Sequence, residues 1–206
     1  MGEVRFFELP PGVPGPERIA VIKQEDKEGC AAASLYALLH TLNIEVEYKQ
    51  LYDELGTTKD GVGDTSKITQ ALTKRHVDFQ ELTVSKSIDL NKILDNDCLY
   101  YAHIQAPNSD YEQKYLTSED REHVGRSKNH GHYVLVFVVE KDRFGKILRL
   151  LIMDSLIDKG ETRYGEGIKA MSLEWFFKRF IDVDTKEGWM LRVPKVQPAE
   201  GEQNEV

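Results

Sequence analysis

Cys30 lies where a thiol could act as a nucleophile. It directly precedes an alanine-rich run, Ala31–Ala33, and leucines follow at helical spacing as far as Leu42. This pattern predicts a helix over Cys30–Leu42 that begins at the cysteine. Free N–H groups and the dipole at a helix N-terminus favour the thiolate, the form of cysteine that attacks carbonyl carbon. A small buried core residue is the other role open to a free cysteine.

The second cysteine, Cys98, begins a predicted strand over Cys98–Gln105, and we interpret it as a core residue. The chain has only two cysteines and shows no Cys-x-x-Cys or His-x-x-x-His spacing. The two thiols cannot build a zinc site without histidines at such spacings. We therefore expect no metal and no cofactor.

A cysteine nucleophile needs a base that takes its proton and later delivers it to the leaving amine. Of six histidines, His130 and His132 flank Gly131 where a polar segment enters an apolar strand predicted over His132–Glu140. Residues two apart on a strand face the same side, so both could point toward Cys30. The pattern leaves the choice between them open, and either could be an ordinary edge histidine.

Two further polar residues could complete such a site. Asp154 ends an apolar strand predicted over Leu148–Asp154, and an acid there is costly to bury unless it is paired. It could orient the base, or it could cap the following turn. Gln24 precedes Cys30 by six residues. Its amide, with the Cys30 N–H, could stabilise an oxyanion, although a surface role is the ordinary one for glutamine.

The elements that must position these residues are helices first and strands later, which predicts an α+β fold with an N-terminal helical half packed on a C-terminal antiparallel sheet. Two strands, His132–Glu140 and Leu148–Asp154, are apolar on successive residues, as in strands buried on both faces. The remaining predicted helices and strands are Tyr48–Leu55, Ser66–Arg75, Asp89–Asn96 and Ser172–Phe180 (helices), and Ile19–Ile22, Val77–Val84, Cys98–Gln105 and Trp189–Val193 (strands).

The chain divides into three parts. Prolines predict an extended arm over residues 1–19, one domain spans residues 20–195, and residues 196–206 form a disordered tail. The polar stretch Ala106–Asn129 leads directly into His132, so we expect it to border the cleft as a lid or substrate-selecting loop.

Composition excludes several classes of protein. The 206 residues carry a net charge of −8 without a long Lys/Arg stretch, which argues against a nucleic-acid binder. The longest apolar run, Val134–Val139, is too short for a transmembrane segment. We see no export signal, and two cysteines suit a reducing compartment, so we expect a cytoplasmic protein. The oligomeric state stays open.

The residues around Cys30 resemble those of the bacteriocin-processing peptidases, papain-like cysteine peptidases that cut double-glycine leader peptides. In Gln24–Leu35 the glutamine, the cysteine six residues later and the small-residue helix follow that family's motif. The run His132-Tyr133-Val134 is similar to its His-aromatic-Val strand, and Asp154 to its strand-ending aspartate. The likeness spans about Val21–Phe180.

This resemblance implies a papain-like fold and a role for each candidate. It makes Cys30 the nucleophile, His132 the base, Asp154 the group that orients the base, and Gln24 the oxyanion donor. His132 is preferred to His130 because the aromatic residue follows it directly. The implied reaction is hydrolysis of a peptide or isopeptide bond in a peptide or protein substrate, through a thioester.

Two alternatives share this fold: an acyltransferase, and a catalytically silent module that binds a peptide or protein partner. The chain also departs from the family pattern at two positions. Ala31 follows the cysteine where the family has glycine, and Ser155 follows the aspartate where the family has proline.

Overall fold

The structure is a computed structural model. It describes residues 4–9, 12, 16–24, 28–58, 61–62, 64–105, 131–156, 167–182 and 185–196. The segment expected to border the cleft, residues 106–129, lies outside the described residues, as do His123, His130 and residues 197–206 of the expected tail.

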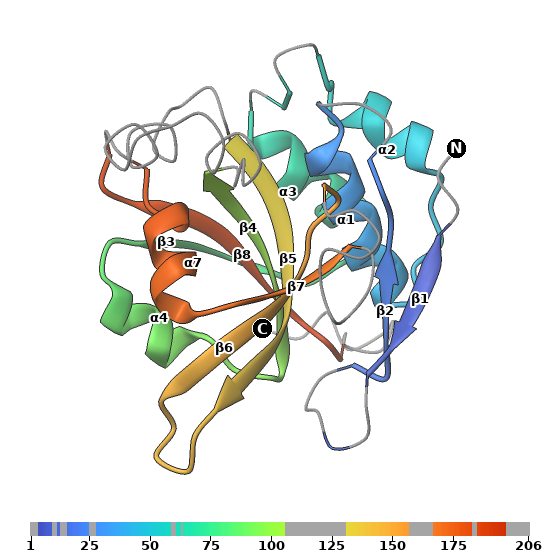
Figure 1. Ribbon diagram of the computed structural model, residues 1–206. Helices are drawn as coiled ribbons and strands as arrows, with labels where there is room; N and C mark the ends of the chain where they lie inside the picture. The colour runs from blue at the N-terminus through green and yellow to red at the C-terminus, as the bar shows by residue number, and fades with distance from the viewer. Residues whose placement is uncertain are drawn as a thin grey trace, which may run out of the picture.

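A six-stranded sheet forms the centre of the fold, and each neighbouring pair of its strands is antiparallel (Figure 1). Its strands, in spatial order, are β3 (Gln80–Val84), β8 (Gly188–Pro194), β4 (Cys98–Gln105), β5 (Gly131–Lys141), β6 (Ile147–Met153) and β7 (Ile168–Met171). A separate two-stranded sheet pairs β1 (Arg5–Glu8) with β2 (Arg18–Val21).

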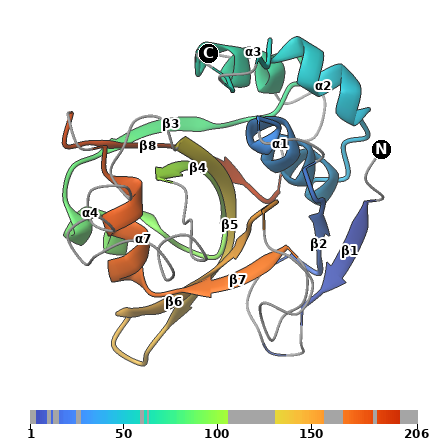
Figure 2. The ribbon, with the colours of Figure 1, turned by 45° about the horizontal axis from the view of Figure 1, so that its top comes forward.

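Helices lie on both sides of the large sheet, as Figures 1 and 2 show. On one side are α1 (Cys30–Thr41), α2 (Tyr48–Glu54) and α3 (Ser66–Thr73), and on the other are α4 (Ser87–Ile93) and α7 (Leu173–Phe180). The predicted α+β class, with an N-terminal helical half and an antiparallel sheet, is confirmed.

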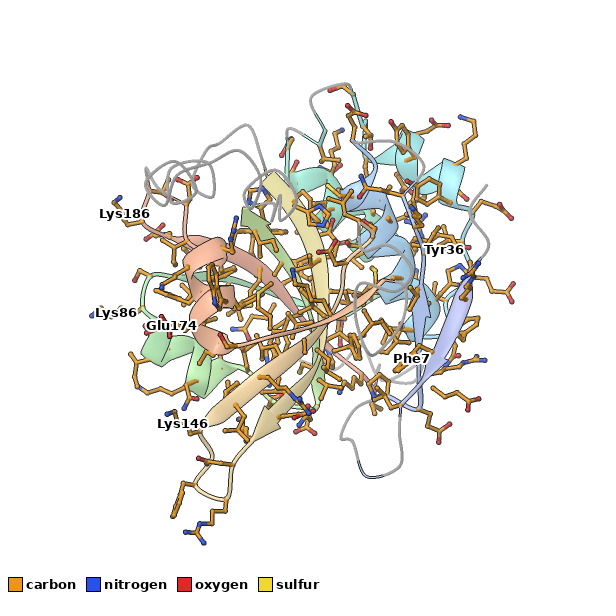
Figure 3. All side chains as sticks on the ribbon, in the orientation of Figure 1. Phe7, Tyr36, Lys86, Lys146, Glu174 and Lys186 are labelled. Atoms are coloured by element: carbon orange, nitrogen blue, oxygen red, sulfur yellow. The ribbon has the colours of Figure 1, made fainter. Side chains whose placement is uncertain are left out.

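Buried side chains form one apolar core on each side of the sheet, and we call these the α1-side core and the α7-side core. Along β5, Leu135 and Phe137 belong to the α1-side core, whereas Val134 and Val136 belong to the α7-side core. This alternation follows from the two-residue period of a strand. Figure 3 shows side chains filling both spaces, with the labelled Tyr36 on the α1 side and Glu174 on the α7 side.

Helix α1 is buried almost all round, with His40 its only residue that is not buried. Leu35, Leu38 and Leu39 are each fully buried, and so are the three alanines that follow Cys30. The small alanine side chains let the sheet and β2 pack closely against the helix. A helix with apolar residues on all its faces is typical of a protein core. The packing therefore fixes the position of Cys30 at the start of this helix.

Several predicted boundaries differ from the observed ones. Strand β7 was not predicted, because its sequence, Ile-Lys-Ala-Met, shows neither strict alternation nor a continuous apolar run. The fourth helix begins at Ser87 and ends at Ile93, because Leu94 takes an extended backbone conformation. Within the expected arm, β1 is extended and pairs with β2, whose first residue lies before the expected boundary at residue 20.

Candidate active site

Cys30 is the first residue of α1 and is 7% exposed. Gly29 occupies the N-cap position, and no side chain caps the helix by a hydrogen bond. The first turn also contains no acidic residue, so no carboxylate there opposes a negative charge on the sulfur. The N–H groups at a helix start and the helix dipole favour an anion at this position.

His132 and Asp154 form a buried pair beside this helix start. The His132 Nε2 atom lies 2.7 Å from Asp154 Oδ1, and the two residues are 1% and 0% exposed. A carboxylate can only accept, so Nε2–H is the donor in this bond. Asp154 Oδ1 also accepts from the Leu156 backbone N–H at 3.0 Å, which holds the carboxylate in place.

The electrostatics of the pair favour its charged form. Burial alone would lower the pKa of His132, but the Asp154 charge, its hydrogen bond and the neighbouring Cys30 raise that pKa to about 10. Burial alone would raise the pKa of Asp154, but the charge and hydrogen bond of His132 hold it below its usual value. An imidazolium and a carboxylate therefore coexist around neutral pH.

The Cys30 side chain lies beside His132 and contributes to the raised pKa of the imidazole. Because Nε2 is engaged by Asp154, Nδ1 is the ring nitrogen left to face the thiol. Cys30, His132 and Asp154 therefore lie together, with Cys30 beside the hydrogen-bonded His132–Asp154 pair. The sequence predicted these three residues as a set, and the structure brings them together.

Gln24 joins the site through the residue that follows Asp154. Its Oε1 atom accepts a hydrogen bond from the Ser155 hydroxyl at 2.6 Å, and its backbone N–H donates to the Ser155 carbonyl at 3.3 Å. Both residues are buried. Nothing in the sequence around Ser155 indicated a role for its hydroxyl.

Aromatic residues support the same region. The Tyr101 hydroxyl donates to the backbone carbonyl of Ala31 at 3.0 Å. The Tyr101 ring stacks on Tyr133, with 5.2 Å between centroids, and Trp189 meets the Tyr133 ring edge-on at 6.4 Å. Sequence reasoning missed Tyr101, although a tyrosine at an inward position of an apolar strand signals a buried hydroxyl that needs a partner.

Three other histidines lie in the described residues. His40 is near the C-terminal end of α1, with its ring 4.1 Å from that of Tyr36. His76 follows α3 and has a positive φ of 54°. His103 lies on β4, where burial and the charge of the neighbouring His132 lower the pKa of its imidazole, and its ring is 4.9 Å from Tyr133.

Cys98 is buried in the α7-side core, whereas Cys30 belongs to the α1-side core. Burial and the nearby Asp95 raise the pKa of the Cys98 thiol, which disfavours its thiolate. Within the described ranges no cluster of three His, Cys, Asp or Glu residues could hold a metal ion. None of the helices in that part of the chain is long and apolar enough to cross a membrane.

One protein family and several solved structures are similar to this chain. A family model, that of the Peptidase_C39 like family, matches residues 17–171. A double-glycine motif protease from an AMS/PCAT transporter, solved with its leader peptide, is 16% identical, with a TM-score of 0.55 and 92% of this chain and 99% of that chain covered.

A C39-like peptidase from Bacillus anthracis is 14% identical, with a TM-score of 0.57 and coverage of 94% of this chain and 100% of that chain. At such identities the structures establish the fold, which agrees with the resemblance seen in the sequence. No curated protein gives a significant match. Because the family model covers more than half of the sequence, the chain belongs to the Peptidase_C39-like family.

Proposed function

We propose that this chain is a cysteine peptidase that hydrolyses a peptide or isopeptide bond through a thioester. The observation that carries the proposal is the buried His132–Asp154 pair, 2.7 Å between Nε2 and Oδ1, in contact with a cysteine at a helix start. Such a pair keeps a proton on the imidazole, and that proton is what a departing amine needs.

Acylation follows from these positions. The Cys30 sulfur attacks the substrate carbonyl carbon, and the carbonyl electron pair moves onto oxygen. The Cys30 backbone N–H and the Gln24 side-chain amide donate to this oxyanion. His132 then gives its proton to the amide nitrogen, the C–N bond breaks, and the amine leaves while the acyl group stays on sulfur as a thioester.

Deacylation reverses the proton transfer. His132, now neutral, takes a proton from a water molecule, and the resulting hydroxide attacks the thioester carbon. The tetrahedral intermediate collapses, the C–S bond breaks, and the carboxylic acid product leaves. Asp154 remains ionised throughout and stabilises the imidazolium each time it forms. The thiolate–imidazolium pair is thereby restored.

A peptide segment of a protein or a free peptide is the proposed substrate. The AMS/PCAT protease was solved in complex with a leader peptide, which supports an extended peptide as the ligand class. We propose a cytoplasmic location, because a chain with only two cysteines suits a reducing compartment.

A peptide-library digest tests the proposal. The wild-type chain, Cys30→Ser and Cys98→Ser are each incubated with the same diverse peptide mixture, and new termini are identified by mass spectrometry. We expect new termini with the wild type and with Cys98→Ser, and none with Cys30→Ser. Equal cleavage by Cys30→Ser, or bound but uncleaved peptides with the wild type, would contradict a peptidase, and the second result would favour a binding module.

A further inference from the structure

We propose that Ser155 is a positioning residue for the oxyanion donor: its hydroxyl holds the oxygen of the Gln24 amide so that the nitrogen is presented to the reacting carbonyl. This inference rests on the proposed function. It concerns the residue that directly follows Asp154.

The contact itself is short and buried. The Ser155 Oγ and Gln24 Oε1 atoms are 2.6 Å apart, and the two residues are 1% and 7% exposed. The backbones are joined as well, because the Gln24 N–H donates to the Ser155 carbonyl at 3.3 Å. The side chain of Gln24 is thus fixed at both its base and its tip by one residue.

An amide carries its acceptor and its donors on opposite branches. A hydroxyl that donates to Oε1 therefore directs the NH2 group away from Ser155, and only the NH2 group can stabilise an oxyanion. Without the hydroxyl, a buried Oε1 would lack this donor, and a glutamine side chain has several torsions in which to seek another partner. Ser155 thus selects the amide orientation that the reaction needs.

The position of Ser155 in the chain links this role to that of the base. Asp154 holds His132, and the adjacent Ser155 holds Gln24. The Leu156 N–H donates to Asp154 Oδ1 at 3.0 Å, which closes a tight turn around Ser155. The two consecutive residues Asp154 and Ser155 therefore provide the hydrogen-bond partners of both the base and the oxyanion donor.

The test uses steady-state kinetics with a peptide that the wild-type chain cleaves. Ser155→Ala removes the hydroxyl, Ser155→Thr retains it, and Ser85→Ala is a matched control at an exposed serine. We expect Ser155→Ala to lower kcat by about tenfold or more with little change in KM, since losing an oxyanion donor outright costs about 10²–10³ in kcat. Ser155→Thr should restore most of the loss.

A double variant separates this role from a merely structural one. In a Gln24→Ala background, Ser155→Ala should cause no further loss of kcat, and in either background the labelling rate of Cys30 with iodoacetamide should stay unchanged. A wild-type kcat in Ser155→Ala, losses that multiply in the double variant, or altered Cys30 labelling would overturn the inference. If the wild-type chain cleaves no peptide, the proposed peptidase function is wrong. If the wild type cleaves and Ser155→Ala has the same kcat, only the role of Ser155 is wrong.

Discussion

The Ser34 hydroxyl donates a hydrogen bond to the backbone carbonyl of Tyr133, with 2.7 Å between the two oxygens. Ser34 lies one turn after Cys30 on α1, and Tyr133 directly follows His132 on β5. The bond therefore ties the helix that carries the thiol to the strand that carries the imidazole. The spacing between Cys30 and His132 depends on this contact as well as on apolar packing.

Replacing Ser34 by alanine should weaken that tie. We expect Ser34→Ala to reduce the free energy of unfolding by about 1 kcal/mol, the usual net contribution of a buried hydrogen bond. Urea denaturation measures the change, with the exposed Ser85→Ala as control. We also expect slower labelling of Cys30, because the thiol and imidazole are held less closely. Unchanged stability and unchanged labelling would show that packing alone sets the spacing.

The His132–Asp154 pair should make stability depend on pH in a defined direction. The pKa of His132 is raised from 6.5 to about 10, so its contribution is complete below pH 6.5 and is lost as pH rises toward 10. The pKa of Asp154 is lowered from 3.8, so its contribution is present above that pH and is lost on acidification.

Asp154→Asn removes the charge that sustains both shifts. The unperturbed pKa values of Asp and His are about 3.9 and about 6.5. The variant should therefore lose the most unfolding free energy, relative to the wild type, between about pH 4 and 6.5. This loss should become smaller as the pH rises from about 6.5 to about 10. Urea denaturation over this range measures it. A difference that stays constant or grows toward pH 10 would contradict the charged pair.

Gln24→Ala separates the oxyanion donor from the thiol–imidazole pair. We expect kcat for peptide cleavage to fall by about 10²–10³, the usual cost of losing one such donor. The labelling rate of Cys30 should remain that of the wild type, because Gln24 takes no part in the proton arrangement of His132. If the labelling rate of Cys30 falls as much as kcat does, Gln24 instead helps to hold the Cys30–His132 pair in place.

Cys98→Ala should leave catalysis intact. Cys98 packs in the α7-side core, away from α1, and the pKa of its thiol is raised. We expect kcat and KM within about twofold of the wild type and a loss of stability near 1 kcal/mol for the removed sulfur. A large loss of turnover, without unfolding, would show that the role assigned to this cysteine is wrong.

The sequence predicted the long elements because they repeat a clear period. Helix α1 has leucines at helical spacing over three turns, and β4 begins and ends where it was expected. The strand β7 was not predicted because its lysine interrupts the apolar residues without producing a strict alternation. Its place at the sheet edge depends on pairing with β6, a long-range contact that a local pattern does not contain.

The residues of the site likewise include some that the sequence predicted and some that it did not. A cysteine at a helix start and an acid after an apolar strand are unusual enough to notice, and the structure joins them through His132. Their catalytic roles stay predictions. Ser34 and Ser155 were missed because serine is common in every setting, and only the fold shows that their hydroxyls are buried against partners distant in sequence.

The most direct test of the central claim is the rate at which iodoacetamide labels Cys30 as a function of pH, read by mass spectrometry with Cys98 in the same sample as an internal control. We expect Cys30 to label rapidly at pH 6, much faster than Cys98, and its labelling rate to change little up to about pH 9, because the pKa of His132 is raised to about 10. In His132→Ala the rate should be low at pH 6 and rise with pH as for an ordinary thiol, near 8.5. A wild-type Cys30 that already follows this ordinary profile, or that resists labelling throughout, would contradict the thiolate–imidazolium pair and the peptidase mechanism built on it.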